Sequence, residues 1–156
     1  MLTRAADYAV RVMVHLATLP SGTRMQRTVL AEATEVPESF MSKVLQGLVR
    51  ARVISSKPGH NGGFELAVAA EEVTLLDVIQ AIDGPVALNL CVGAAPGCDR
   101  HPGCPAHPVW LEAQEAVARV LRSATIAALA AKTNASSQFA AAAGLTPLAN
   151  QESRTR

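Results

Sequence analysis

Apolar residues recur every three or four positions over much of this chain, the spacing of amphipathic helices. The first run ends near residue 17 and follows Thr3, a good N-terminal cap. Further helices are predicted over residues 29–35, 38–51, 75–82, 108–122 and 126–131. Their starts are marked by Thr28, Pro37, Thr74, Pro108 and Thr125. The pattern therefore predicts a mainly α-helical fold.

A β-hairpin interrupts the helical pattern after the third predicted helix. Residues 53–56 and 63–67 have strand character, and turn-forming residues 57–62 join them. Two helices joined by a tight turn and followed by such a hairpin are the element order of a winged helix-turn-helix, a DNA-binding fold. In the second helix of the pair, the residues expected to be buried are Phe40, Val44, Leu45 and Leu48.

The opposite face of that helix is polar, as a helix that enters a DNA major groove requires. Ser, Gln and Lys can meet base edges and phosphates, and glycines let a hairpin tip approach the backbone. A polar face is equally typical of a solvated helix, and it is the added hairpin that favours DNA binding. The candidate DNA-binding residues are Arg27, Glu38, Ser39, Ser42, Lys43, Gln46, Arg50, Lys57, His60, Asn61 and Gly62.

Composition narrows the class of protein. The 156 residues are 49% hydrophobic, 17% charged and 3% aromatic, which fits one helical domain and argues against a β-sandwich or a disordered chain. The net charge of +1 is uninformative, but residues 1–66 carry +3 and residues 67–156 carry −2. No apolar run is long enough to span a membrane, and no signal-peptide pattern precedes the first helix. We therefore expect a cytoplasmic protein with no membrane partner.

Three cysteines lie in a loop over residues 86–106 that is rich in Gly and Pro. In a reducing compartment, such a cluster indicates a metal or redox site rather than a disulfide. Six residues separate Cys91 from Cys98 and five separate Cys98 from Cys104, wider than the usual spacing of zinc ligands. An iron–sulfur cluster fits better but needs a fourth ligand. His107 is the local candidate, and Asp7 of the same or a partner subunit is the remote one.

Taken together, these motifs resemble the IscR/NsrR-type family of winged-helix, iron–sulfur-cluster-sensing transcription regulators. The resemblance covers about residues 2–129. The motifs that carry it, besides the three cysteines, are Leu2-Thr3-Arg4, Asp7-Tyr8-Ala9-Val10, Val44-Leu45-Gln46, Leu48-Val49, Gly62-Gly63-Phe64-Glu65-Leu66-Ala67, Thr74-Leu75-Leu76-Asp77-Val78-Ile79 and Val109-Trp110.

The resemblance implies a homodimer on a palindromic operator in double-stranded DNA, with the helix over residues 108–122 forming much of the dimer interface. It also implies that the three cysteines bind a 2Fe-2S or 4Fe-4S cluster. His107 matches the ligand of the branch that senses cluster supply, and Asp7 matches the partner-subunit ligand of the branch that senses nitric oxide. The chain carries both, so cluster type, fourth ligand and signal stay open. The six-residue spacing, and Ser42 where the supply-sensing branch has an acidic residue, depart from those branches.

We therefore expect four segments: a DNA-binding domain over 1–84, a cluster loop over 85–107, a dimerisation helix with a short following helix over 108–131, and a flexible tail over 132–156. The expected function is a transcription regulator, a repressor by default, whose cluster responds to redox state, nitric oxide or cluster supply. The alternative is a zinc- or thiol-based module that uses Cys91, Cys98, Cys104 and His107. An enzyme with a small-molecule substrate is not expected, because no catalytic Cys/His signature or phosphate loop is present.

Overall fold

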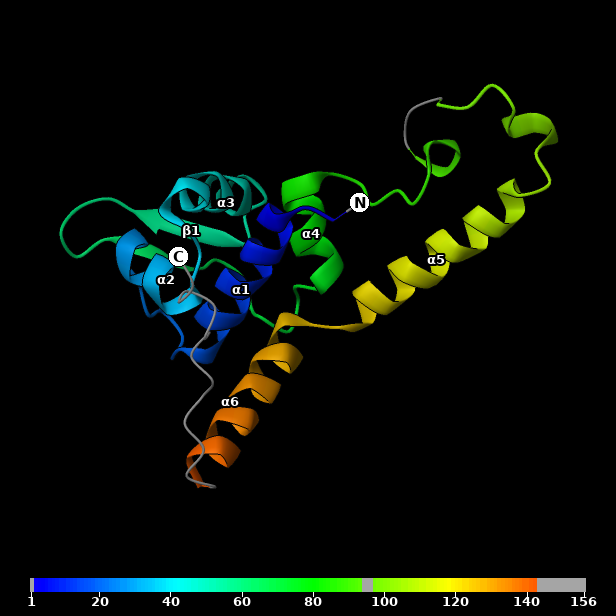
Figure 1. Cartoon of the computed structure of the whole chain (residues 1–156). Helices are drawn as coiled ribbons and strands as arrows, with labels where there is room; N and C mark the ends of the chain where they lie inside the picture. Colours follow the sequence, from blue (N-terminus) through cyan, green and yellow to red (C-terminus); the bar gives the residue numbers. More distant parts are fainter. Residues whose placement is uncertain (1, 94–96, 143–156) are drawn as a thin grey trace, which may run out of the picture.

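The computed structural model describes residues 2–93 and 97–142 (Figure 1). The fold is mainly helical, as predicted, with one antiparallel pair of strands. In chain order the elements are α1 (Arg4–Thr18), α2 (Arg27–Thr34), α3 (Glu38–Arg50), β1 (Ile54–Lys57), β2 (Gly63–Leu66), α4 (Leu75–Asp83), the 3-10 turns η1 (Leu90–Val92) and η2 (His101–Gly103), α5 (His107–Ser123) and α6 (Ile126–Ala142).

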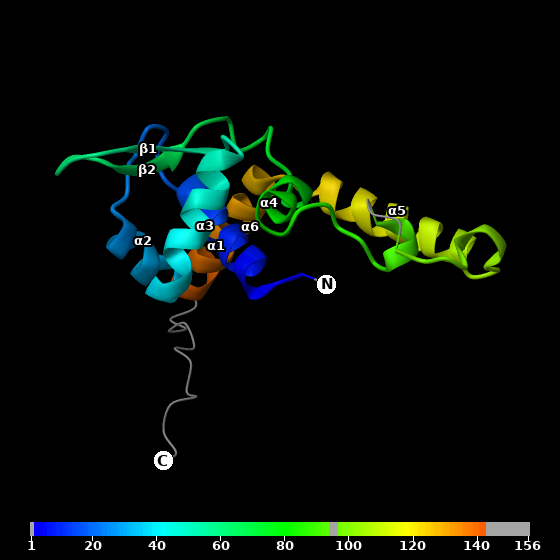
Figure 2. The same ribbon diagram turned by 90° about the horizontal axis from the view of Figure 1, so that it is seen from above.

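Helix α1 lies at the centre of a helical body, with α2, α3, α4 and α6 packed around it (Figures 1 and 2). Its residues Ala9, Val12 and Met13 are fully buried. The helix starts where the sequence predicts, because the Thr3 hydroxyl accepts a hydrogen bond from the N–H of Ala6 at 3.3 Å. This core holds α3 in place and leaves its other face exposed.

The helix-turn-helix pair corrects two predictions. Helix α2 begins at Arg27, so Thr28 lies inside the helix and is not its cap. In α3, Phe40 is 37% exposed, whereas its neighbour Met41 is fully buried. The helical period explains this difference. Val44 and Met41 lie one and two turns before Leu48 on the buried face, and Phe40 falls at the edge of that face.

The hairpin of β1 and β2 forms the predicted wing, and a third segment of chain lies along it. Met25 and Phe64 exchange two backbone hydrogen bonds of 3.0 and 2.9 Å. Next to this contact Gly63 has φ +136°, and a Cβ built there would lie only 2.5 Å from the carbonyl oxygen of Met25. Position 63 therefore requires glycine, and the wing is joined to the segment that precedes α2.

Helix α5 projects from the body, with the cysteine loop at its far end (Figures 1 and 2). No residue of α5 is fully buried. Its C-terminal end is fixed to the body by hydrogen bonds from Leu75 N–H to the Ala124 oxygen, 2.8 Å, and from Ile126 N–H to the Val73 oxygen, 2.9 Å. The junction between α5 and α6 is thus held at the start of α4.

Helix α6 is longer than the sequence analysis predicts. It runs from Ile126 to Ala142 instead of ending at Ala131, because the alanine-rich stretch favours helix and contains no helix breaker. Residues 132–142 of the predicted flexible tail are therefore helical, and residues 143–156 lie outside the described part of the chain. None of the helices among the described residues combines the length and the apolar character that a membrane crossing needs.

Candidate nucleic-acid interface and cysteine loop

A groove of about 510 Å³ lies between the exposed face of α3 and the wing. Leu45, Val49 and Phe64 supply its apolar lining. Ser42, Gln46 and Arg50 add polar side chains that follow each other at intervals of one turn along α3. The remaining lining residues are Arg27 and Ser56. The structure thus brings part of the predicted DNA-binding set together on one open face.

Arg27 links the start of α2 to the start of α3. Its guanidinium donates a hydrogen bond to the Ser42 hydroxyl at 2.9 Å and lies 3.5 Å from a carboxylate oxygen of Glu38. Both partners of the ion pair are about half exposed, and such surface pairs contribute little stability. Arg27 can therefore exchange Glu38 for another anionic partner at small cost.

The other predicted contacts lie at the surface, with one exception. Gly62 is buried. A Cβ at this position would lie only 2.0 Å from the carbonyl oxygen of Lys57. Its N–H donates to the Gly59 oxygen at 2.9 Å. Gly62 therefore shapes the wing tip and does not present a contact surface. The exposed candidates on α3 and the wing are Ser39, Lys43, Gln46, Arg50, Lys57, His60 and Asn61.

Gln26 is a residue that the sequence analysis missed. Its side-chain amide donates hydrogen bonds to the backbone oxygens of His60, at 2.9 Å, and Gly62, at 3.4 Å. These bonds attach the tip of the wing to the residue that precedes α2. No local pattern could have indicated this role, because more than thirty residues separate the partners.

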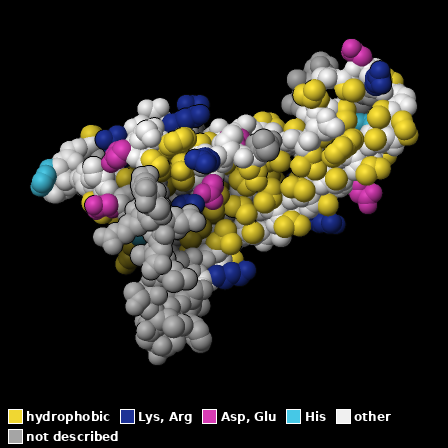
Figure 3. All heavy atoms as spheres, in the orientation of Figure 1, with side chains coloured by type: hydrophobic (Ala, Val, Ile, Leu, Met, Phe, Trp, Pro, Cys, Tyr) yellow, Lys and Arg dark blue, Asp and Glu magenta, His cyan; other side chains and the backbone are white. Residues whose placement is uncertain are grey.

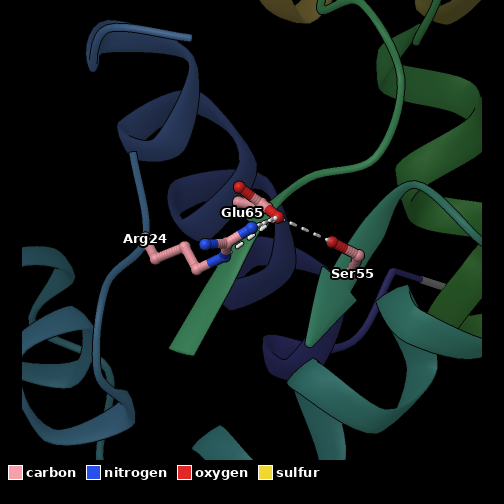
Figure 4. A network of polar contacts seen from close by, with 3 residues as sticks. All are labelled: Arg24, Ser55 and Glu65. Carbon is pink, nitrogen blue, oxygen red and sulfur yellow. Dashed lines mark hydrogen bonds and ion pairs between the residues drawn. The ribbon is translucent and has the colours of Figure 1, made fainter. Parts of the chain in front are cut away.

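The base of the wing is held by a second polar network (Figure 4). Arg24 donates from two guanidinium nitrogens to the same carboxylate oxygen of Glu65, at 3.0 and 2.7 Å. The Ser55 hydroxyl donates to that oxygen at 3.4 Å. The Glu65 side chain is only 17% exposed, so this pair is better shielded from water than the one at Arg27. The wing is consequently fixed at both its base and its tip.

The three cysteines are free thiols on the loop that leads into α5. Cys91 and Cys104 are half-buried, and Cys98 is exposed. Cys91 lies in η1, which begins where the Asn89 side chain accepts the Leu90 N–H at 2.7 Å. The backbone at Gly97 then packs against this turn, since a Cβ at 97 would come within 2.9 Å of the Leu90 Cβ. The residues next to Cys91 and Cys98 are therefore in contact.

Cys104 and His107 share the turn that starts α5, because the N–H of His107 donates to the Cys104 oxygen at 3.1 Å. Within residues 2–93 and 97–142 of the single chain, no three side chains of His, Cys, Asp or Glu gather as a set of metal ligands. The donor chemistry nevertheless fits a thiophilic group, since three thiols lie on a glycine-containing loop whose backbone packs closely at Gly97.

Asp7 lies on the first turn of α1, which belongs to the helical body, whereas the cysteine loop lies at the far end of α5 (Figure 1). Its carboxylate forms an ion pair with Arg11 at 2.8 Å and is 59% exposed. The guanidinium of Arg11 also lies 5.6 Å from the centre of the Tyr8 ring. Asp7 is thus accessible to a second molecule, and within one chain it is remote from the thiols.

Hydrophobic side chains cover much of the side of α5 seen in Figure 3, although the helix also carries the exposed charged residues Glu112, Glu115, Arg119 and Arg122. Val109 and Val120 are 65% and 64% exposed, and Leu111 is about half exposed. Leu88 and Leu90 of the neighbouring loop are exposed as well. An extended apolar patch of this kind is typical of a protein–protein interface.

The comparisons with known proteins agree with this geometry. A family model described as "Rrf2: Iron-dependent Transcriptional regulator" matches residues 2–132. A protein of Mycobacterium tuberculosis (strain H37Rv), named as an HTH-type transcriptional regulator, is 35% identical over 129 residues, which are 83% of this chain and 80% of that protein. The relatives are regulators and not enzymes, which confirms that expectation.

Two solved structures show the same fold. The first is CymR of B. subtilis, titled the global cysteine regulator, with a TM-score of 0.69 and 21% identity over 85% of this chain and 97% of that one. The second is T. potens IscR, with a TM-score of 0.68 and 20% identity over 85% of this chain and 88% of that one. With the match over residues 2–132, they confirm the resemblance seen in the motifs. This chain belongs to the Rrf2 family of winged-helix transcriptional regulators.

Proposed function

We propose that the chain acts as a homodimeric repressor that binds a palindromic DNA operator, and that an iron–sulfur cluster sets its affinity for that operator. The observation that carries the proposal is the groove between α3 and the wing, whose polar residues Ser42, Gln46 and Arg50 face outward beside Arg27. The same chain carries three free thiols on one loop. The proposal thus assigns DNA reading and sensing to separate parts of the fold.

In the proposed complex α3 enters the major groove and the wing lies on the adjacent backbone. Ser42 and Gln46 can donate to and accept from base edges, whereas Lys43 and Arg50 supply charge for phosphates. Arg27 adds a third cation once a phosphate takes the place of Glu38. Gln26 and Arg24 hold the wing against the segment that precedes α2, which favours contact of both the wing and α3 with the same DNA duplex.

The dimer is proposed to form through α5. Its exposed Val109 and Val120, which lie on one face of the helix with Ala113, Ala116 and Val117, would lose contact with water against the same helix of a second copy. A twofold interface of this kind relates two copies of α3, which a palindromic operator requires. It also brings a second chain next to the cysteine loop at the start of α5.

Cys91, Cys98 and Cys104 are the proposed cluster ligands, with Asp7 or His107 as the fourth. When bound, the cluster supplies an iron centre that reacts with oxygen or nitric oxide. His107 is available from the same turn as Cys104. Asp7, on the first turn of α1, is proposed to come from the second copy.

The side chains around Asp7 offer a route from the ligand to the DNA-reading helix. An Asp7 carboxylate that leaves Arg11 loses only an exposed i, i+4 ion pair, worth about 0.3–0.5 kcal/mol. Arg11 then changes its position over the Tyr8 ring, and that ring packs against Phe40 of α3. A change at Asp7 is therefore proposed to shift α3 relative to its symmetry mate.

A zinc- or thiol-based module is the second candidate. The exposed Cys98 thiol favours it, because an accessible thiol can be oxidised without any metal. The similar fold of CymR, titled a cysteine regulator, also agrees with it. In this case Cys91, Cys98, Cys104 and His107 would bind zinc or respond directly to redox state.

Anaerobic purification with measurement of iron, sulfide and zinc separates these functions. The proposal predicts brown protein with iron and sulfide, and no colour in Cys98→Ala. The matched control is Asp99→Ala, which removes the exposed neighbour of Cys98 but no thiol. Colourless protein with stoichiometric zinc, or with no metal, would support the second candidate and contradict the first.

The fourth ligand is identified by two further variants, Asp7→Asn and His107→Ala. The one that removes a ligand should lose the cluster faster and change its visible spectrum. Operator DNA for binding assays is obtained by selection from a random duplex library with the iron-loaded and metal-free proteins in parallel. A palindromic consensus with half-sites about one helical turn apart is the expected result.

A further inference from the structure

The start of the cysteine loop is tied to the middle of α5 by one side chain, Gln114. Its Oε1 accepts a hydrogen bond from the N–H of Leu88 at 2.9 Å. Its Nε2 donates to the carbonyl oxygen of Val86. One amide group therefore binds two backbone groups of the loop at the same time, as a neighbouring strand would.

The loop depends on this contact because it has little other structure. Between α4 and η1 it contains no helix or strand, and its backbone groups would otherwise need water as partners. The side chains of Leu88 and Leu90 are exposed and do not hold this part of the loop, whereas the η1 turn that follows contacts α5. Gln114 is half-buried beneath it.

The contact lies close to the thiols along the chain. Directly after Leu88, Asn89 caps the η1 turn that carries Cys91, and Gly97 packs on the same turn just before Cys98. On the helix, Gln114 is seven residues after His107, which puts the two on the same face about two turns apart. The loop therefore returns along the face of α5 on which His107 lies.

We propose that Gln114 is a positioning residue for the cysteine loop. Its hydrogen bonds to Val86 and Leu88 fix the position of Cys91 along α5. Cys91 is thereby held at a defined distance from the turn that contains Cys104 and His107. Only the side-chain amides of Gln and Asn carry a donor nitrogen and an acceptor oxygen on one planar group, so no charged or apolar residue can replace it. Its effect on the loop stands on this geometry, whereas any effect on a cluster rests on the proposed function.

The test compares Gln114→Ala with Glu112→Ala, which shortens an exposed side chain of the same helix. In reduced, metal-free protein, the Leu88 amide of Gln114→Ala should exchange its hydrogen at least about threefold faster, because it has lost its acceptor. Maleimide labelling of Cys91, followed by mass spectrometry, should also speed up. Labelling of the already exposed Cys98 should change little, and Glu112→Ala should match the wild type.

Gln114→Glu provides a second variant that keeps the acceptor for Leu88 but places an oxygen against the Val86 carbonyl. It should give an intermediate labelling rate for Cys91. Unchanged Cys91 labelling in both Gln114 variants would overturn the proposal. The iron-loaded protein adds a separate readout, in which Gln114→Ala should lose iron to a chelator faster than Glu112→Ala. If the wild type binds no iron, the proposed function fails, while the exchange and labelling results still decide the role of Gln114.

Discussion

The rings of Tyr8 on α1 and Phe40 on α3 pack edge to face, with centroids 5.2 Å apart and planes at 70°. This contact joins the first turns of α1, where Asp7 and Arg11 pair, to the exposed start of the proposed DNA-reading helix. Phe40 is partly exposed, and the contact with the Tyr8 ring gives its side chain a specific packing partner. Aromatic pairs of this geometry contribute about 0.5–1.5 kcal/mol beyond the area they bury.

Replacement of Tyr8 tests whether this contact couples the two sites. Tyr8→Leu should lower the free energy of unfolding by about 1 kcal/mol and reduce the difference in operator affinity between iron-loaded and metal-free protein. Tyr8→Phe is the matched control, because it keeps the ring. Urea denaturation and fluorescence anisotropy with operator DNA measure the two effects. A Leu variant with the full wild-type difference in affinity would exclude a coupling role for Tyr8.

Replacement of Gly63 in the wing should lower the free energy of unfolding more than replacement of Gly59. Gly59 and Gly63 both have positive φ, but a Cβ at 63 would meet the Met25 backbone, whereas a Cβ at 59 would meet nothing within 4 Å. Gly63→Ala should therefore lower the free energy of unfolding by about 2 kcal/mol more than Gly59→Ala, and should weaken DNA binding. Equal losses in thermal or urea unfolding would show that the Met25 contact does not fix the wing.

Removal of Lys43 should change the salt dependence of DNA binding. Lys43 is exposed on α3, and a phosphate contact there would release about one counterion. Lys43→Ala should reduce the slope of log affinity against log salt by about 0.9. Lys132→Ala on α6 removes the same charge outside the groove and should leave the slope as it is. An unchanged slope in Lys43→Ala would mean that Lys43 makes no phosphate contact.

Acid should destabilise the fold through His15. Burial lowers the pKa of His15 below its ordinary value of 6.5, and its Nε2 is buried without a hydrogen-bond partner among the described residues. Because the unfolded chain binds this proton more tightly, the free energy of unfolding should fall as the pH drops below about 6.5. His15→Gln should show a smaller fall between about pH 7.5 and 5.5 than the wild type or the exposed control His60→Gln. Identical pH profiles for all three proteins would exclude the effect.

Local signals in the sequence predicted much of the fold. Thr3, Thr74 and Thr125 all accept hydrogen bonds from backbone N–H groups in the first turns that follow them, as their positions before apolar periodic segments indicate. The strands of the wing also lie within one residue of the predicted ends. These features depend on residues only a few positions apart, which is why one sequence is enough to find them.

Features that depend on distant partners could not be predicted. Gln26 binds the wing tip and Gln114 binds the loop, and neither contact leaves a periodic pattern. The contact of Phe40 with Tyr8 likewise joins residues more than thirty positions apart. The assignment of the three thiols to a cluster stays a prediction, because a complete ligand set would need a donor from a second chain or a closed loop.

The affinity for operator DNA, measured without oxygen on iron-loaded and metal-free protein from the same preparation, tests the central claim most directly. The account predicts a change of at least about fivefold between the two forms, the scale of ordinary allosteric coupling. It also predicts that this change disappears in Cys98→Ala. Equal affinities of the two forms for the selected operator would contradict the account and would leave an operator-binding regulator without a metal switch.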